Sequence, residues 1–181
     1  MGDFPVLRFR QTSDFGYVPN AKLTNVFMGT AVDLVDNGPD PIHPRYKEDV
    51  GIRLSLGALN LAYNNKTVEY YSPRVNTITF TNSVVNILFF SEFPISFIVN
   101  NKNGFEVCCN NAACPIDNLN LWTKITDFNV QQDKVTFNVP GSCTTLQIVR
   151  YAWRQKPCEF KQCALYSASS NLPLVPFYFR L

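Results

Sequence analysis

The sequence predicts a short α/β segment followed by a mostly antiparallel β-sandwich. One apolar run and one helical pattern occupy the first third of the chain, whereas short runs of Val, Ile, Thr and Phe separated by turn residues fill the rest. Aromatic residues make up 14% of the chain and its 12 prolines separate these short runs, which favours antiparallel β structure over a helical bundle. We therefore expect two domains, residues 1–65 and residues 66–181.

The run NVFMGTAVDLVD, residues 25–36, is almost continuously apolar and ends in aspartates. This pattern is typical of a strand buried on both faces in a parallel sheet. Such a strand alone is an open edge, which predicts association with a complementary fragment. The loop after it is a candidate site because α/β folds bind ligands beyond the carboxyl ends of their strands.

Residues 44–63 read as a helix. Pro44 suits its first turn, and Glu48 and Asp49 suit its positive end. An apolar stripe follows the helical period; it consists of Val50, Leu54, Ala58 and Leu61. One strand and one helix do not close a sheet, so we expect this part to need partners from outside the chain.

From Thr67 onward the pattern is that of a sandwich of about eight strands. The turns at 101–104 and 131–134 suit hairpins. The proline-rich tail, residues 169–181, suits an extended cover or an edge strand. The expected strands are residues 67–71, 76–80, 84–90, 95–99, 105–109, 125–130, 134–139 and 146–153.

All six cysteines lie in the carboxyl half and their number is even; they are Cys108, Cys109, Cys114, Cys143, Cys158 and Cys163. This favours a disulfide framework formed in an oxidising compartment over free structural thiols. A metal site is disfavoured, because zinc usually needs C-x2-C pairs or companion histidines and the one histidine lies far upstream. Cys158 with Cys163, closing a short loop, is the one pairing we expect.

Asn65-Lys66-Thr67 has the spacing of an N-glycosylation acceptor and follows the helical pattern, although an ordinary polar turn explains it equally well. Like the even number of cysteines, this triplet favours a secreted or lumenal protein. The amino end lacks the charged lead, apolar core and cleavage site of a secretory signal, so we expect an amino-terminal portion to be missing.

Charge and hydropathy disfavour several classes of partner. The formal charge is +2 without a basic run or acidic tail, which argues against nucleic acid. No stretch approaches the roughly 20 apolar residues of a membrane-spanning helix. Nothing in the sequence calls for a cofactor.

The only histidine, His43, closes the tetrad Asp40-Pro41-Ile42-His43 in the loop after the apolar run. A carboxylate there can hold the imidazole Nδ1 proton and leave Nε2 as a general base toward a serine hydroxyl. A surface or helix-capping histidine is the competing interpretation. A cysteine nucleophile beside His43 is disfavoured, because the cysteines cluster in the other domain and are expected to be oxidised.

Five motifs together resemble the carboxyl-terminal part of the eukaryotic sialate O-acetylesterases, serine esterases of the SGNH-hydrolase kind. They are RQTSDFGYVPN, FMGTAVDLVD, IHPRYK, LGALNLAY and RYAW...PCEFKQCALY, and the likeness covers essentially the whole chain. The resemblance implies that the α/β segment is the last strand and helix of an SGNH-hydrolase-like sheet. It also implies hydrolysis of O-acetyl esters of sialic acids by a Ser-His-Asp arrangement, in lysosomal, secreted or cytosolic forms, and cysteines placed as in the family.

The resemblance assigns the family's Asp-x-x-His block to Asp40 and His43, with Asp36 or Asp33 as rival acids. The segment with Leu7, Arg8 and Gln11 resembles one that leads toward the active site, so Gln11 is a candidate to line the pocket; a structural role for Arg8 and Gln11 fits equally well.

The chain departs from the family where the nucleophile is expected. The serine block and the oxyanion-hole Gly and Asn blocks are absent, and a His-Asp pair alone supplies little because the members of a triad act as a unit. We therefore expect no activity from the chain alone. The expected partners are the missing amino-terminal esterase segment and an O-acetylated sialic acid or related glycan.

The alternative is a non-catalytic module in which the sandwich binds a glycan or a protein. Trp122 or Trp153 would then stack on sugar faces, although core packing is the commoner fate of tryptophan.

Overall fold

The structure is a computed structural model of the 181-residue chain and describes residues 4–35, 43, 45–109, 114 and 121–181. Within these residues no helix has both the length and the apolar character needed to cross a membrane. The helices are α1 (Phe4–Arg10), α2 (Lys47–Gly57) and the π-helical turn η1 (Ala58–Ala62). The strands are β1 (Arg74–Thr81), β2 (Val84–Phe90), β3 (Phe97–Val99), β4 (Phe105–Cys109), β5 (Thr123–Lys124), β6 (Asn129–Gln131), β7 (Lys134–Asn138), β8 (Leu146–Tyr151), β9 (Leu165–Ser167) and β10 (Phe177–Arg180).

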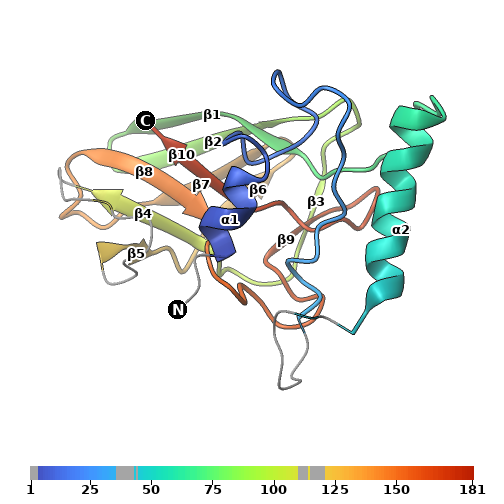
Figure 1. Ribbon diagram of the computed structural model, residues 1–181. Coiled ribbons are helices and arrows are strands. Elements are labelled where there is room, and N and C mark those ends of the chain that lie inside the picture. Colours follow the sequence, from blue (N-terminus) through green and yellow to red (C-terminus); the bar gives the residue numbers. More distant parts are fainter. Residues whose placement is uncertain (1–3, 36–42, 44, 110–113, 115–120) are drawn as a thin grey trace.

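Two four-stranded sheets, ordered β1-β2-β7-β6 and β10-β8-β4-β5, face each other, and β3 and β9 form a small third sheet (Figure 1). All pairings between the strands are antiparallel. Val85 and Ile87 of the first sheet and Val107 and Val149 of the second are 0% exposed in one shared core. The predicted antiparallel β-sandwich is confirmed.

The two large sheets differ in what covers their outer faces. In β2 and β7 buried and more exposed residues alternate, because one face meets the core and the other meets solvent. In β8 nearly every residue is buried. Helix α1 packs beside this second sheet, where the Phe9 ring lies 5.7 Å from that of Trp153 and 6.1 Å from that of Tyr178 (Figure 1).

Of the two predicted hairpin turns, one is confirmed. Residues 131–134 connect β6 to β7, with Gln132 at φ 45°. The prediction for residues 101–104 is wrong, because β3 and β4 on either side of them belong to different sheets. Gly104 there has φ +112° and a Cβ on it would lie 2.9 Å from the Tyr151 ring, so the glycine allows a close crossing over the core.

Of two further segments expected to be extended, the tail forms a strand and residues 67–71 do not. The tail forms β10 at the edge of its sheet, as expected for an extended edge segment. Residues 67–71 form no strand. Instead, side-chain contacts hold this segment, since the Glu69 carboxylate accepts hydrogen bonds from the hydroxyls of Ser167, Ser169 and Ser170.

The strand expected at residues 25–36 is not present in the described part, residues 25–35. A strand needs a neighbour for its backbone N–H and C=O groups, and none of the described strands pairs with this segment. The segment instead runs between α2 and the sheets, mostly extended, with a turn in which the Leu34 N–H donates to the Ala31 carbonyl (Figure 1). It packs closely on α2, since a Cβ on Gly57 would lie 2.3 Å from the Phe27 ring.

The predicted helix is present but buries a different face. It begins at Lys47 and continues past Gly57 into η1. The buried side chain of α2 is Arg53, whereas Leu54 of the expected apolar stripe is 41% exposed and Ile52 is 52% exposed. The helix therefore contacts the rest of the chain through a buried charge as well as through the close packing at Gly57.

All six cysteines are paired, as Cys108–Cys114, Cys109–Cys143 and Cys158–Cys163. This confirms the disulfide interpretation over free thiols, and the third bond is the pairing expected from the sequence. Cys109–Cys143 ties β4 to the loop before β8, which lies beside it in the sheet.

A buried ion pair joins the extended segment to α2. Nη1 and Nη2 of Arg53 lie 2.6 and 2.9 Å from the two carboxylate oxygens of Asp33, and Nη1 also donates to the carbonyl of Thr30. The side chains of Asp33 and Arg53 are 0% and 8% exposed. Tyr166 of β9 donates its hydroxyl to Asp33 Oδ2 at 2.9 Å, so the same carboxylate also binds the sandwich.

Replacing Arg53 by methionine leaves Asp33 buried without its cation. We expect the free energy of unfolding to fall by about 3–5 kcal/mol, because an uncompensated buried charge is costly. Denaturant unfolding of the chain measures this change.

Arg10→Met is the matched control, since Arg10 pairs with Asp14 on the exposed surface of the same chain. The denaturant midpoint of the Arg10→Met chain should stay close to that of the unaltered chain. Equal effects of the two substitutions would contradict the assignment of Asp33 as the anchoring group.

Candidate functional site

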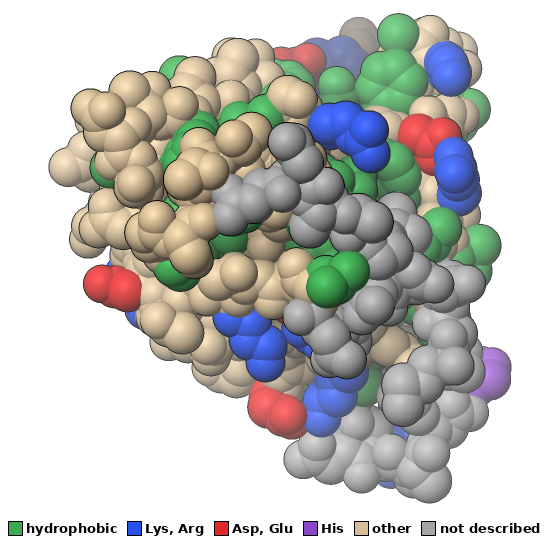
Figure 2. Space-filling model, turned by 90° about the vertical axis from the view of Figure 1, so that its left-hand side faces the viewer, with side chains coloured by type: hydrophobic (Ala, Val, Ile, Leu, Met, Phe, Trp, Pro, Cys, Tyr) green, Lys and Arg blue, Asp and Glu red, His purple; other side chains and the backbone are tan. Residues whose placement is uncertain are grey.

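His43 lies on the surface, four residues before the first residue of α2. A histidine is visible at the surface in Figure 2, at the edge of the face shown. Asp40 and Asp36, the expected acid and one of its rivals, lie outside the described residues. The pairing of His43 with either therefore stays a prediction.

Asp33, the other rival acid, is fully engaged in structural contacts. Its two carboxylate oxygens accept hydrogen bonds from Arg53 and from the Tyr166 hydroxyl. Burial, followed by the charge of Asp33 and its hydrogen bond, raises the pKa of Tyr166, so the phenol keeps the proton that it donates. These contacts support a structural role for Asp33.

The loop closed by the Cys158–Cys163 disulfide holds both sides of the segment that contains His43. Before that segment, the Lys161 N–H donates to the Asp33 carbonyl at 2.8 Å. After it, the Phe160 ring stacks on Tyr46 with centroids 3.9 Å apart, and Lys161 Nζ pairs with Asp49 of α2 at 2.7 Å.

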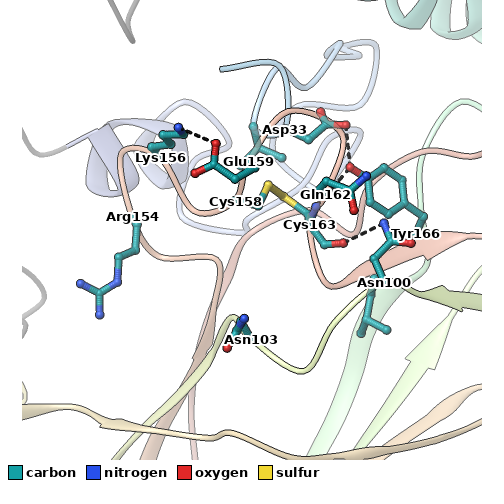
Figure 3. Close-up of a disulfide and its surroundings, with 12 residues drawn as sticks. Asp33, Asn100, Asn103, Arg154, Lys156, Cys158, Glu159, Gln162, Cys163 and Tyr166 are labelled. Atoms are coloured by element: carbon teal, nitrogen blue, oxygen red, sulfur yellow. Dashed lines mark hydrogen bonds and ion pairs between the residues drawn. A yellow bond between two sulfur atoms is a disulfide. The ribbon is translucent and has the colours of Figure 1, made fainter. Parts of the chain in front are cut away.

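Figure 3 shows this disulfide beside Asp33 and Tyr166, with the hydrogen bond between these two residues drawn. On the other side of the loop, Asn100 donates its side-chain N–H to the Cys163 carbonyl at 3.2 Å. The disulfide loop, residues 158–163, is thus anchored in the sandwich and contacts the chain on both sides of residues 36–42. It fixes the two ends of the segment to which His43 belongs.

A cavity of about 440 Å³ lies between α1, residues 28–35 and the sandwich. Gln11 is among its lining residues, although its role in binding stays a prediction. Arg8 lines the same cavity and donates to the carbonyls of Arg154 and Gln155 at 2.7 and 2.9 Å, which ties α1 to the segment that follows β8. Burial lowers the pKa of the Arg8 guanidinium from its ordinary value.

Both tryptophans are buried. Trp122 is 6% exposed beneath the Arg150 guanidinium, whose central carbon lies 3.6 Å from the ring centroid, and Trp153 is 2% exposed beside α1. Neither indole offers a face at the surface for stacking on a sugar.

Asn65 is exposed in the turn that follows η1. Its side-chain oxygen accepts a hydrogen bond from the Thr67 hydroxyl at 2.8 Å. The acceptor triplet is therefore accessible on the surface; its glycosylation stays a prediction.

Sequence reasoning missed the residues that hold the site together, namely Arg53, Tyr46, Phe160, Lys161 and Tyr166. One signal was present: Arg53 lies in a largely apolar helical stretch, IRLSL, and Asp33 lies inside the apolar run before it. Because charges are seldom buried alone, that combination indicates an ion pair. Among the described residues no group of three or more His, Cys, Asp or Glu side chains is arranged to hold a metal ion.

Comparison with known proteins gives a consistent result. The family described as "Sialate O-acetylesterase C-terminal domain" matches residues 74–181, which begin with β1. Sialate O-acetylesterase of Mus musculus is 38% identical over 96% of this chain and 32% of its own length. The Homo sapiens enzyme is 36% identical over 96% of this chain and 33% of its own length.

The fold has a relative among solved structures. A carbohydrate acetylesterase from Xanthomonas citri superposes with a TM-score of 0.76 at 22% identity, covering 99% of this chain and 37% of that one. The chain spans about a third of the length of its curated relatives. The family match and the identities over nearly the whole chain show that it belongs to the sialate O-acetylesterase family, as a carboxyl-terminal part of such a protein.

Proposed function

We propose that this chain is the part of an esterase of O-acetylated sialic acids that supplies the general base His43 and its carboxylate partner Asp40. The observation that carries the proposal is the family relationship over 96% of the chain, combined with an Asp-x-x-His tetrad that precedes α2 in the sequence. The serine nucleophile and the oxyanion donors come from a complementary amino-terminal segment.

In the proposed reaction, His43 Nε2 accepts the proton of the serine hydroxyl as its oxygen attacks the acetyl carbonyl. Asp40 holds the Nδ1 proton and stabilises the imidazolium that forms. The histidine then protonates the departing sugar oxygen, and water activated by the same imidazole releases acetate from the acetyl-serine. The disulfide loop supports this role because it restricts the ends of the catalytic segment.

The surface around α2 supports the proposed partner. Exposed apolar side chains lie on α2 and η1 and on the extended segment that packs against them. They are Ile52 (52%), Leu54 (41%), Leu59 (40%), Val26 (38%) and Met28 (42%). A complementary segment of the esterase would cover this surface, and without it the chain is expected to associate or aggregate.

The alternative, a non-catalytic glycan- or protein-binding sandwich, gains no support from the residues proposed to bind a sugar. The two tryptophans that would stack on a sugar are buried. Secretion or delivery to lysosomes belongs with the esterase proposal, and the three disulfides agree with an oxidising compartment.

Esterase activity should require both parts of the protein. We expect the purified chain alone to leave an O-acetylated sialic acid intact, and the chain co-expressed with an amino-terminal segment bearing the serine block to release acetate. In the complex, His43→Gln should lower kcat by at least about a thousandfold and Asp40→Asn by about 10⁴-fold.

Two substitutions serve as controls for the acid. Asp36→Asn tests the rival carboxylate, and Asp133→Asn makes the same change in the exposed turn between β6 and β7. Neither should change kcat appreciably. Acetate release by the chain alone, or full activity of the His43→Gln complex, would contradict the proposed mechanism.

The stacking of Phe160 on Tyr46 should position the His43 segment. Because His43 is the only histidine, its ring gives a single set of imidazole NMR signals. We expect Phe160→Ala to shift and broaden these signals, since one side of the segment loses its contact, whereas Phe160→Tyr keeps the stack and should leave them in place. Unchanged signals in Phe160→Ala would show that the disulfide loop does not position His43.

Asn65 should carry glycan when the chain is secreted from a eukaryotic host. We expect a mobility shift that endoglycosidase removes. Thr67→Ala should abolish the shift, and Thr67→Ser, which keeps the acceptor triplet, should retain it. A single unshifted form of the unaltered secreted chain would count against modification at this turn.

A further inference from the structure

The cavity between α1 and the sandwich has a lining that is positively charged. Three arginines line it, Arg8, Arg53 and Arg74, and its described lining contains no aspartate or glutamate. Asp33 neutralises Arg53 from outside the cavity. Arg8 and Arg74 form no salt bridge with any carboxylate of the described residues. The cavity therefore has two cations that lack a counter-ion in the described chain.

Arg74 is the more deeply buried of these two arginines, at 8% exposure. Its guanidinium lies over the rings of Tyr71 and Tyr17, 3.7 and 4.6 Å from their centroids. It makes long contacts to the carbonyls of Val18 and Pro19, at 3.3 and 3.5 Å, and its Nε has no acceptor. A buried cation without an anion is unfavourable, so this environment favours an anionic occupant.

Trp153 provides an independent sign of an absent acceptor. Its side chain lines the same cavity, the residue is 2% exposed, and the indole Nε1–H has no hydrogen-bond partner. Buried N–H groups without an acceptor are rare in folded proteins. A ligand oxygen in the cavity would satisfy this donor.

The remaining walls suit a small amphipathic ligand. Met28, Val32 and Val35 contribute apolar surface, whereas Gln11 and Ser72 contribute polar groups. A volume of about 440 Å³ falls within the usual range for small-molecule sites, about 300–1,000 Å³. Val35, the last described residue before position 43, is part of this lining, so the cavity lies near His43 in the sequence.

We propose that this cavity binds the carboxylate of a sialic acid, with Arg74 and Arg8 supplying positive charge and Trp153 a neutral donor. The inference rests on the proposed function and deepens it, because it names the charged group by which the sugar is held while an acetyl ester elsewhere on it reacts. Acetylation of a hydroxyl leaves the carboxylate untouched, so the same site holds substrate and deacetylated product.

A ligand pair tests this site without any substitution. N-acetylneuraminic acid and its methyl ester differ in the carboxylate charge, and calorimetry measures the binding of each to the purified chain. We expect the acid to bind at least about tenfold more tightly than the ester, because charge-assisted hydrogen bonds are lost with the charge. Equal affinities, or no binding of the acid, would overturn the site.

Arg74→Gln identifies the residue responsible. We expect it to weaken binding of the acid about ten- to hundredfold and to change binding of the ester little. Arg180→Gln, the same change at an exposed position of β10, is the matched control and should leave both affinities unaltered. Acid preference that survives Arg74→Gln in full would contradict the assignment.

Repeating the titration on the complex with the complementary segment separates a sugar from a polypeptide occupant. Retained acid-selective binding supports the site, whereas its loss on assembly would show that a carboxylate of the segment fills the cavity. Hydrolysis without acid-selective binding would overturn the site and leave the proposed function standing. Acid-selective binding without hydrolysis by the complex would support the site and contradict the proposed function.

Discussion

The buried carboxylate of Asp33 is the interaction on which the arrangement of the chain depends. It accepts two hydrogen bonds from Arg53 of α2 and one from the Tyr166 hydroxyl of β9. The backbone carbonyl of Asp33 also accepts a hydrogen bond from the N–H of Lys161 in the disulfide loop. One residue thus joins the extended segment, the helix and the sandwich. Because a buried carboxylate is stable only with such partners, the three parts are held in one geometry.

The sandwich could be predicted because its signals are local. Alternation along β2 and β7 and the turn at residues 131–134 are readable from a few adjacent residues. The strand expected at residues 25–36 failed for the opposite reason. Its apolar run fits a buried strand, but a strand also needs a neighbour for its backbone, and the described chain supplies none.

The candidate site was only partly accessible from the sequence. The Asp-x-x-His tetrad and the Cys158–Cys163 loop are short patterns that a reader can find directly. The contacts that surround these patterns in the fold join residues that are distant in the sequence. Tyr166 contacts Asp33 across 133 positions, and Arg74 contacts Val18 across 56 positions. No local pattern encodes such pairs, so the contact of Tyr166 with the anchoring carboxylate and the positively charged cavity emerged only from the fold.

The central claim is that His43 serves a serine supplied by a complementary segment. A crystal structure of the co-expressed complex tests it most directly, through the distance from His43 Nε2 to the serine Oγ. The account predicts a separation of about 2.6–3.2 Å, with a carboxylate oxygen of Asp40 within hydrogen-bonding distance of Nδ1. An ordered His43 that faces solvent, with the serine served by another base, would contradict it.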